Sequence, residues 1–241
     1  MRDRISGLNT PKHIAIIPDG NRRWAIEHNL PISMGHKKGV DVLREVLETS
    51  FDIGITCLSF WGASLANLSK RSKREVHLLN TLYEENFKKL VRDKAIHEHQ
   101  VRVRVFGEWE TVLGEGSRQA IRSAIEATEK YSRFSLNFLI AYDGTIEMVS
   151  AIEKIIREAH LNPEIKITPE LIKQNLYTSD IPPVDLLIRT GGEPHLSAGF
   201  MMWEITEAQL YFTDKYWPDF TGDDLKGAVA EYHNRDRRFG R

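Results

Sequence analysis

The residues best suited to chemistry stand directly after the first apolar run of the chain, His13–Ile17. They form the segment Pro18-Asp19-Gly20-Asn21-Arg22-Arg23-Trp24. Arginine side chains bind phosphate oxygens through paired hydrogen bonds, and free amides at the start of a helix attract the same anions. Magnesium commonly takes one or two carboxylates and completes its shell with substrate phosphates, so Asp19 is a candidate metal ligand. The segment therefore predicts a diphosphate and metal site; an ordinary capped turn with solvated arginines is the alternative.

Two later segments carry similar chemistry. Gly35-His36-Lys37-Lys38-Gly39 begins an amphipathic stretch, where a histidine can donate to phosphate or transfer a proton near neutral pH. Ser64-Leu65-Ala66-Asn67 leads into a basic run that contains Arg71, so small polar side chains could orient a substrate beside a phosphate-binding arginine. The alternatives are a solvated basic helix start and a capping loop, since Ser72-Lys73-Arg74-Glu75 fits a capping box.

A fourth polar segment follows the apolar run Leu186-Leu187-Ile188. It reads Arg189-Thr190-Gly191-Gly192-Glu193-Pro194-His195-Leu196-Ser197. Two adjacent glycines allow backbone amides to approach an anion closely, and Arg189 places a cation at the end of the run. The segment predicts a second phosphate pocket, with a plain glycine turn as the alternative.

These segments need a scaffold that brings them together. The candidate strands are Ile14–Ile17, Cys57–Trp61, Val101–Phe106, Leu136–Ala141 and Val184–Arg189. The candidate helices are Arg22–His28, Gly35–Ser50, Arg74–His97, Gly114–Lys130, Ile146–His160, Pro169–Tyr177 and Gly222–Asn234. This alternation predicts a single α/β domain over residues 1–241, with a central, mostly parallel sheet flanked by helices on both faces. Ligands bind beyond the carboxyl ends of parallel strands, so the polar segments are expected to meet at one edge of the sheet.

Composition limits the classes of protein that fit. Of the 241 residues, 41% are hydrophobic, and 33 basic residues nearly balance 34 acidic ones, which argues against a general nucleic-acid binder. The chain has one cysteine, Cys57, and therefore no internal disulfide, which fits a reducing compartment. Cys57 is interpreted as a small buried residue, with a catalytic thiol as the alternative. The chain shows neither an apolar run near the ~20 residues of a membrane span nor a signal sequence, which predicts a cytoplasmic protein. Nucleotide-binding glycine motifs, zinc spacings and a serine-hydrolase elbow are also missing from the sequence.

Several segments together resemble one known family, the cis-prenyltransferases, also called undecaprenyl diphosphate synthases. The segments that carry the resemblance are His13–Ala25, Gly35–Gly39, Ser64–Val76, Asp185–Ser197, Leu210–Phe220 and Asn234–Gly240. The resemblance implies an enzyme that joins an allylic prenyl diphosphate to isopentenyl diphosphate with Mg²⁺, on a parallel-sheet fold that forms a homodimer. It also implies an apolar tunnel for the growing hydrocarbon. The stretch containing Val76, Leu79, Leu82, Phe87 and Leu90 could line that tunnel or simply pack in the core.

The resemblance also implies a role for individual residues. Asp19 would hold the magnesium ion that assists departure of the allylic diphosphate, and Asn67 would help to take up the proton that the reaction releases. The residues expected around the allylic diphosphate are Gly20, Asn21, Arg22, Arg23, Trp24 and His36. Those expected beside the reacting carbons and in the following loop are Ser64, Leu65, Ala66 and Arg71. Isopentenyl diphosphate would meet Arg189, His195, Leu196, Ser197 and Gln209. Arg238 and Gly240 belong to a C-terminal Arg-x-Gly that reaches into the partner subunit's site.

Some positions depart from the usual family pattern, and they lie in the expected site. The departures are Arg22 for glycine, Ile32 and His195 for arginine, Ala66 and Gln209 for glutamate, and one additional residue before Lys70. Pro-Asp-Gly-x-Arg-Arg-Trp combined with Ala-Asn-x-Ser also resembles the lavandulyl-type branch, which makes branched products.

Head-to-tail elongation, the usual reaction of the family, is the leading expectation. A short-chain or branching condensation and a non-catalytic partner subunit stay open, as does a phosphate-ester hydrolase that uses Asp19. A possible transient contact with a membrane during product release is a further expectation, although residue spacing identifies no anchor.

Overall fold

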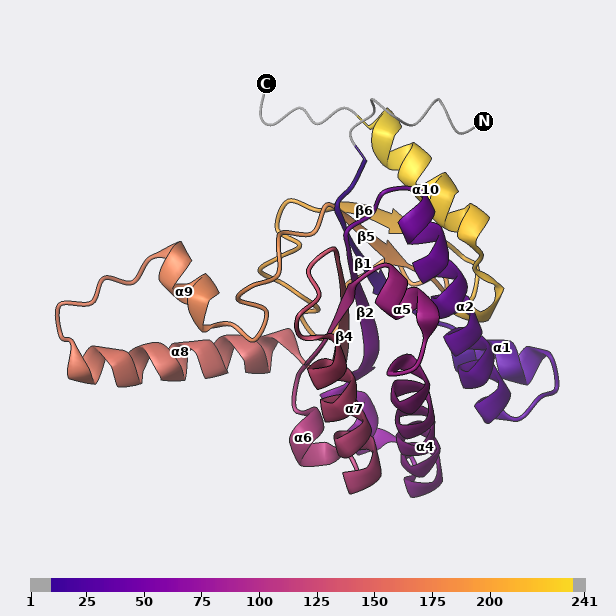
Figure 1. Ribbon diagram of the computed structural model, residues 1–241, viewed down its shortest axis with the longest axis horizontal. Coiled ribbons are helices and arrows are strands. Elements are labelled where there is room, and N and C mark those ends of the chain that lie inside the picture. The colour runs from indigo at the N-terminus through magenta and orange to yellow at the C-terminus, as the bar shows by residue number, and fades with distance from the viewer. Residues whose placement is uncertain (1–9, 236–241) are drawn as a thin grey trace.

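The centre of the molecule is a six-stranded sheet with the strand order β3-β4-β2-β1-β5-β6 (Figure 1). The structure, a computed structural model, describes residues 10–235. The strands are β1 (His13–Ile17), β2 (Cys57–Ser64), β3 (Val101–Phe106), β4 (Phe134–Tyr142), β5 (Leu186–Arg189) and β6 (Gln209–Phe212). Each pair of neighbouring strands runs parallel. The predicted α/β class with a mostly parallel sheet is confirmed.

Strand β1 lies in the middle of the sheet, where the strand order changes direction. Strands β2, β4 and β3 lie on one side of it, and β5 and β6 lie on the other. Its five residues are all buried, as expected for an apolar strand covered on both faces. Ile16 pairs with Phe60 of β2, and Ile17 pairs with Arg189 of β5. The carboxyl ends of β1 and β5 therefore lie side by side at the point where open parallel sheets bind ligands.

The helices lie in the connections between these strands, and the last two follow β6. In chain order they are α1 (Asn21–Glu27), α2 (Ile32–Asp52), α3 (Leu65–Lys70), α4 (Lys73–Leu90), α5 (Lys94–Glu98), α6 (Trp109–Val112), α7 (Glu115–Thr128), α8 (Gly144–Leu161), α9 (Pro169–Asn175), the short 3₁₀ helix η2 (Trp217–Asp219) and α10 (Gly222–Asn234). Several begin at a side-chain cap: Ser72 caps α4, Asp143 caps α8 and Thr221 forms a full capping box with Asp224.

The two faces of the sheet are covered differently. On one face Ile16 packs in a cluster with Val46 of α2 and Leu225 of α10, while α4 and α7 pack against each other beside β3 and β4. On the other face Ile17 packs with Phe200 and with other residues of the chain between 181 and 210. This second layer consists mainly of irregular chain, whereas the sequence predicts helices on both faces.

One predicted helix, Arg74–His97, is two helices in the structure. Helix α4 ends at Leu90, and α5 begins after Asp93, whose side chain accepts a hydrogen bond from the backbone N–H of Ala95 at 3.0 Å. The apolar periodicity continues across the turn, so the sequence alone does not reveal the break. Strand β6 and helices α3 and α6 were not predicted either.

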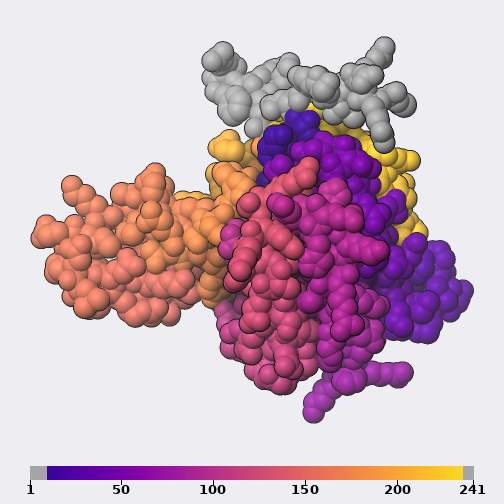
Figure 2. All heavy atoms as spheres, in the orientation of Figure 1, coloured from indigo at the N-terminus to yellow at the C-terminus, as the bar shows by residue number. Residues whose placement is uncertain are grey.

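Helices α8 and α9 extend away from the sheet as an arm (Figure 1). The arm stands clear of the remainder of the molecule in the space-filling view as well (Figure 2). Among residues 10–235, we find no helix with both the length and the apolar character that a membrane span requires.

Candidate active site

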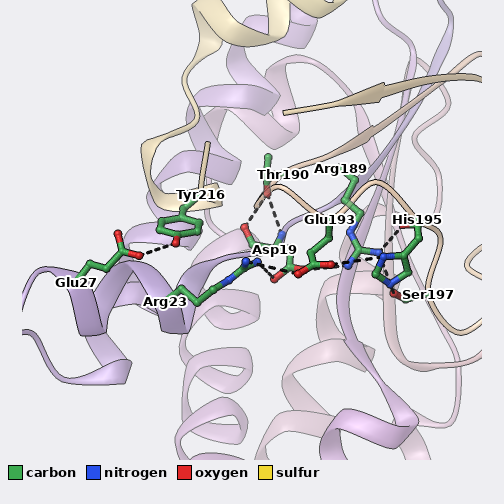
Figure 3. Close-up of polar contacts among 9 residues, drawn as sticks. All are labelled: Asp19, Arg23, Glu27, Arg189, Thr190, Glu193, His195, Ser197 and Tyr216. Atoms are coloured by element: carbon green, nitrogen blue, oxygen red, sulfur yellow. Dashed lines mark hydrogen bonds and ion pairs between the residues drawn. The ribbon is translucent and has the colours of Figure 1, made fainter. Parts of the chain in front are cut away.

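Asp19 lies just beyond the carboxyl end of β1, with Arg23 on one side and Arg189 on the other (Figure 3). Its Oδ1 accepts a hydrogen bond from Nη2 of Arg23 at 3.1 Å, and its Oδ2 accepts one from Nη2 of Arg189 at 3.0 Å. Arg189 is buried, and its Nη1 donates to the carbonyl oxygen of His195 at 2.6 Å and to Oγ of Ser197 at 2.8 Å. One guanidinium therefore joins the first predicted phosphate segment to the last.

Backbone contacts fix the position of Asp19. The hydroxyl of Thr190 donates to the Asp19 carbonyl oxygen at 2.8 Å and accepts from the Asp19 N–H at 2.9 Å. Gly191 has a φ of +88°, and a Cβ at this position would lie 3.1 Å from the Asp19 Cβ and 2.7 Å from Nη2 of Arg23. Only glycine fits there without displacing the pair. The backbone does approach the carboxylate closely at Gly191, but the amides of the double glycine face elsewhere: the N–H of Gly191 donates to the carbonyl oxygen of Lys215 at 2.7 Å and that of Gly192 to the carbonyl oxygen of Thr213 at 3.0 Å.

A second charged cluster surrounds Glu75, in the first turn of α4. Its carboxylate lies 3.6 Å from Nη1 of Arg22, 3.4 Å from Nε of Arg71 and 3.8 Å from Nε2 of His36. The three basic side chains come from α1, from α2 and from the loop between α3 and α4. Glu75 and His36 are largely buried, with side chains 10% and 11% exposed, so their surroundings screen the charges less than water would.

His36 stays neutral at physiological pH. Burial and, after it, the Arg71 charge lower its pKa to about 4, against the opposing effect of the Glu75 carboxylate. Within the part of the chain that the structure describes, its Nε2 has no hydrogen-bond partner. A neutral imidazole whose ring nitrogen is free can donate to a phosphate or accept a proton, depending on its tautomer.

Ser64 and Asn67 lie together at the end of β2. The Ser64 hydroxyl caps α3 by accepting the backbone N–H of Asn67 at 2.9 Å. Both residues line the same cavity as Asp19. The predicted polar pair therefore lies beside the charged clusters.

A cavity of about 940 Å³ connects these groups to the core. Its charged end is lined by Asp19, Arg22, Arg23, His36, Arg71 and Arg189. Its apolar part is lined by Leu43, Leu47, Phe60, Leu79, Leu82, Phe87 and Leu90. The rise of a helix places Leu90 roughly 16 Å beyond Leu79, so the cavity is a tunnel between α2 and α4. The apolar tunnel predicted along α4 is confirmed, except that Val76 lines a separate groove beside α7.

Charged side chains reappear at the far end of the tunnel. Arg44 of α2 and Asp93, in the turn after α4, both line the cavity. They form an ion pair at 3.3 Å, with 59% of the Arg44 side chain exposed. The pair bridges the gap between α2 and the α4–α5 turn.

The structure brings most of the predicted site residues into this cavity. Those that line it are Asp19, Gly20, Asn21, Arg22, Arg23, His36, Ser64, Ala66, Asn67, Arg71, Arg189 and Ser197. Those that do not line it are Trp24, Leu65, His195, Leu196 and Gln209. The roles of the residues in both groups stay predictions. Arg238 and Gly240 lie outside the described residues.

The positions of two residues outside the lining have clear physical reasons. Trp24 donates its indole N–H to Asp219 at 2.7 Å and stacks on His28, so it fixes α1 in place. Gln209 begins β6 and pairs with Leu186, three residues before the Arg189 end of β5. Its side-chain oxygen is buried without a hydrogen-bond partner among residues 10–235.

Sequence reasoning missed three residues of the site. Glu75 was interpreted only as part of a capping box, yet it holds three basic side chains. Glu193 lies 3.7 Å from Arg23 and 3.6 Å from His195, and Thr190 holds the Asp19 backbone. A carboxylate within each basic segment was the signal that could have identified the two glutamates.

The donor set suits one magnesium ion that is shared with substrate. Among the described residues, no group of three or more His, Cys, Asp or Glu side chains gathers as a self-sufficient metal site. Asp19 is 34% exposed at the cavity, and its two oxygens are held by arginines rather than by other acids. A single carboxylate fits Mg²⁺, which takes its remaining ligands from phosphates and water.

A cluster of basic groups for phosphates, opening into a long apolar tunnel, defines an enzyme that acts on diphosphates with hydrocarbon tails. Comparisons with known proteins agree. The family described as "Putative undecaprenyl diphosphate synthase" matches residues 17–240. A tritrans,polycis-undecaprenyl-diphosphate synthase (geranylgeranyl-diphosphate specific) from Pyrococcus horikoshii is 42% identical, over 99% of this chain and 90% of the relative. An isoprenyl transferase from Heliobacterium mobile is 38% identical, over 100% and 91%.

Solved structures share the fold over nearly the whole chain. Lavandulyl diphosphate synthase from Lavandula x intermedia, crystallised with dimethylallyl diphosphate, superimposes with a TM-score of 0.90 at 32% identity, covering 96% of this chain and 99% of that one. A probable undecaprenyl diphosphate synthase from Campylobacter jejuni gives 0.78 at 26% identity, covering 97% and 100%. The chain belongs to the undecaprenyl diphosphate synthase family and is a cis-prenyltransferase.

Proposed function

We propose that this enzyme condenses isopentenyl diphosphate with an allylic prenyl diphosphate, in a Mg²⁺-dependent reaction that releases diphosphate and extends a cis-prenyl chain. The observation that carries the proposal is the 3.0 Å contact between Asp19 and Arg189, which joins the two predicted phosphate segments at the mouth of one apolar tunnel. Two diphosphates held there would have their reacting carbons close together, which removes much of the entropic barrier.

The basic residues lie where negative charge develops. In the proposed reaction the allylic C–O bond breaks, and the diphosphate leaves with the bonding electron pair. Arg22, Arg23 and the neutral His36 would hold this leaving group, and fixed cations stabilise such charge in a partly desolvated site. Asp19 would hold the magnesium ion, which when bound polarises the diphosphate oxygens.

The second substrate would bind at Arg189 and Ser197. The double bond of isopentenyl diphosphate supplies the electrons of the new C–C bond, after which its C2 loses a proton. Asn67, which lines the cavity, would help to relay that proton toward the leaving diphosphate. The proton and the released diphosphate complete the balance of the reaction.

The tunnel supports a long acyclic product. Its volume of about 940 Å³ lies at the upper end of the roughly 300–1,000 Å³ typical of small-molecule sites. The Pyrococcus horikoshii relative is named as specific for geranylgeranyl diphosphate, and we propose that acceptor for this chain as well. Each buried methylene of the growing chain contributes about 0.8 kcal/mol, so the lining favours retention of the intermediate.

A branched, lavandulyl-type condensation is the second candidate. It is favoured by the TM-score of 0.90 with lavandulyl diphosphate synthase and by the Asp19–Trp24 and Ala66–Ser69 patterns. Both candidates use two diphosphates and the same charged mouth, so the position of the new bond distinguishes them.

One assay separates these possibilities. Purified protein is incubated with Mg²⁺, isopentenyl diphosphate and one of dimethylallyl, farnesyl or geranylgeranyl diphosphate. We expect diphosphate release only when both substrates are present, and loss of turnover in EDTA. Mass spectrometry and NMR of the dephosphorylated product give its length and branching. Release from a single substrate without a condensed product would indicate a hydrolase, release from an allylic diphosphate alone with a branched product would indicate the second candidate, and no release under any condition would indicate a non-catalytic subunit.

We also propose that the enzyme is a homodimer joined through the α8–α9 arm. Val149, Ile152 and Ile156 lie on one side of α8 and are 56%, 47% and 52% exposed. Apolar side chains at this spacing form a stripe, and such a stripe on a projecting helix usually meets another protein surface. A second copy of the arm would cover it symmetrically.

Light scattering tests the dimer. We expect the wild-type chain to elute at twice the monomer mass, and Ile152→Asp/Ile156→Asp to elute as a folded monomer. Val112→Asp, on the exposed side of α6, is the matched control. A wild-type monomer at micromolar concentration would contradict the proposal.

The setting of the reaction is proposed to be the cytoplasm, with transient membrane contact when the product leaves. The supporting observation is the chemistry of the proposed product, whose hydrocarbon chain is poorly soluble in water.

A further inference from the structure

Exposed large hydrophobic side chains gather in two places among the described residues: the α8–α9 arm and the hairpin of residues 26–34, which we call the α1–α2 hairpin. In this hairpin Ile26, Leu30 and Met34 are 63%, 39% and 44% exposed. Pro31 and Ile32 lie between them in sequence, and Ile32 stands where the family pattern implies an arginine. Pro31 is also exposed, whereas Ile32 is half-buried, so four of these nine residues are both apolar and exposed.

The hairpin is a fixed projection. Asn29 adopts a left-handed φ of 54°, and the N–H of Leu30 donates to the carbonyl oxygen of Ala25 at 2.8 Å, which closes the turn. At its base, Trp24 stacks on His28 with ring centres 4.3 Å apart and donates to Asp219. The hairpin stands out from the body, on the side away from the α8–α9 arm (Figures 1 and 2).

Cations lie immediately behind the apolar tip. Lys37 and Lys38 are exposed one turn along α2 from Met34, and neither forms an ion pair within residues 10–235. Residues three and four apart share a side of a helix, so both lysines lie on the same side as Met34. The acid of the hairpin, Glu27, accepts a hydrogen bond from the Tyr216 hydroxyl at 2.6 Å. Apolar residues in front and basic residues behind are the pattern of a segment that lies in the headgroup region of a bilayer.

The hairpin borders the mouth of the active-site cavity. Ile26 lines that cavity together with Arg22 and Arg23 of the same helix. A surface that contacts this hairpin therefore lies beside the opening through which the substrates enter.

We propose that the α1–α2 hairpin docks on the surface of a membrane that contains anionic lipids and turns the cavity mouth toward it. Leu30 and Met34 enter the headgroup boundary, while Lys37 and Lys38 contact lipid phosphates. The purpose of this contact, delivery of a hydrocarbon product into the bilayer, rests on the proposed function; the contact itself does not.

Vesicle flotation tests the proposal without substrates. The full chain is mixed with vesicles of phosphatidylcholine alone or with vesicles that also contain phosphatidylglycerol in the proportion that gives a surface potential of roughly −30 mV. We expect the wild type to float with the anionic vesicles, and binding to fall as salt rises. Leu30→Glu/Met34→Glu should reduce the bound fraction about tenfold or more, because both apolar contacts are lost. Neither residue lines the cavity, so turnover in detergent should be unchanged.

Two further variants sharpen the result. Lys37→Ala/Lys38→Ala should weaken binding to the anionic vesicles only, and Val112→Glu, far from the hairpin, should bind like wild type. Wild-type protein that floats with neither vesicle would overturn the proposal. Hairpin variants that bind vesicles as the wild type does would also overturn it. So would hairpin variants whose only change is in the oligomeric state of the protein in solution. An enzyme that binds vesicles but makes no prenyl product would instead defeat the proposed function.

Discussion

The mouth and the wall of the tunnel are built on different principles. At the mouth, the carboxylates of Asp19 and Glu75 each contact basic side chains from segments far apart in the sequence. The distances between the carboxylate oxygens and the side-chain nitrogens are 3.0 to 3.8 Å. Along the tunnel, leucine and phenylalanine side chains from α2 and α4 leave open volume and make few directed contacts.

This contrast indicates which substitutions the enzyme should tolerate at each place. A directed charge contact depends on the position of each atom, so a small shift removes most of its effect. An apolar wall acts through its shape and area, so one substitution changes the available length rather than the chemistry. Substitutions at the mouth should therefore change rate, and substitutions in the tunnel should change product.

The largest effect is expected for Asp19→Ala. Turnover should fall on the order of 10³-fold, because a metal ligand and the partner of two arginines are both lost. Steady-state release of diphosphate measures it, and a thermal melt checks that the variant is folded. Asp223→Asn, on the exposed start of α10, is the control and should keep wild-type turnover. Near-normal turnover of Asp19→Ala would refute the assigned role.

A subtler change at the mouth is Arg189→Lys, which keeps the charge but removes the planar fork. The guanidinium reaches Asp19, His195 and Ser197 at once, and an ammonium group cannot match this geometry. We expect kcat/KM for isopentenyl diphosphate to fall roughly 10–100-fold, the equivalent of one or two charge-assisted hydrogen bonds. If lysine restores full activity, charge alone is sufficient at this position.

Leu82→Trp tests the tunnel. The larger side chain should occupy part of the cavity and shorten the product, with a much smaller change in the rate of the first condensation. Chromatography of the dephosphorylated products measures the length distribution. Lys89→Trp, on the exposed side of the same helix, is the matched control. An unchanged product length in Leu82→Trp would mean that the chain does not grow along α4.

The smallest expected effect is on the stability of the fold and concerns the titration of His36. Its pKa is about 4 in the folded protein against 6.5 when unfolded, so the unfolded state binds the proton more readily. This contribution to stability is complete above pH 6.5 and is lost as the pH falls toward 4, by about 2 kcal/mol between pH 7 and pH 5. Denaturant unfolding of wild type and His36→Asn at both pH values measures it. The variant should lose less stability on acidification; an equal loss would assign the effect to other groups.

The sequence predicted the parts of this molecule that depend on local pattern. Strand β1 with Asp19 after it, and the apolar face of α4, follow from periodicity and from chemistry at the end of a run. The charged cluster around Glu75 could not be predicted from the sequence, because its side chains meet only when α1, α2 and α4 are packed. The distance of Gln209 from the Arg189 end was also hidden, since it is set by the pairing of β6 with Leu186.

The contact between Asp19 and Arg189 joins residues 170 positions apart. A ribosome must therefore complete most of this polypeptide before the central strand acquires its neighbour β5. Long-range parallel pairing is slow to form, so catalytic competence should appear late during synthesis. Until then the nascent enzyme has Arg23 beside Asp19 but lacks the second arginine that orients this acid.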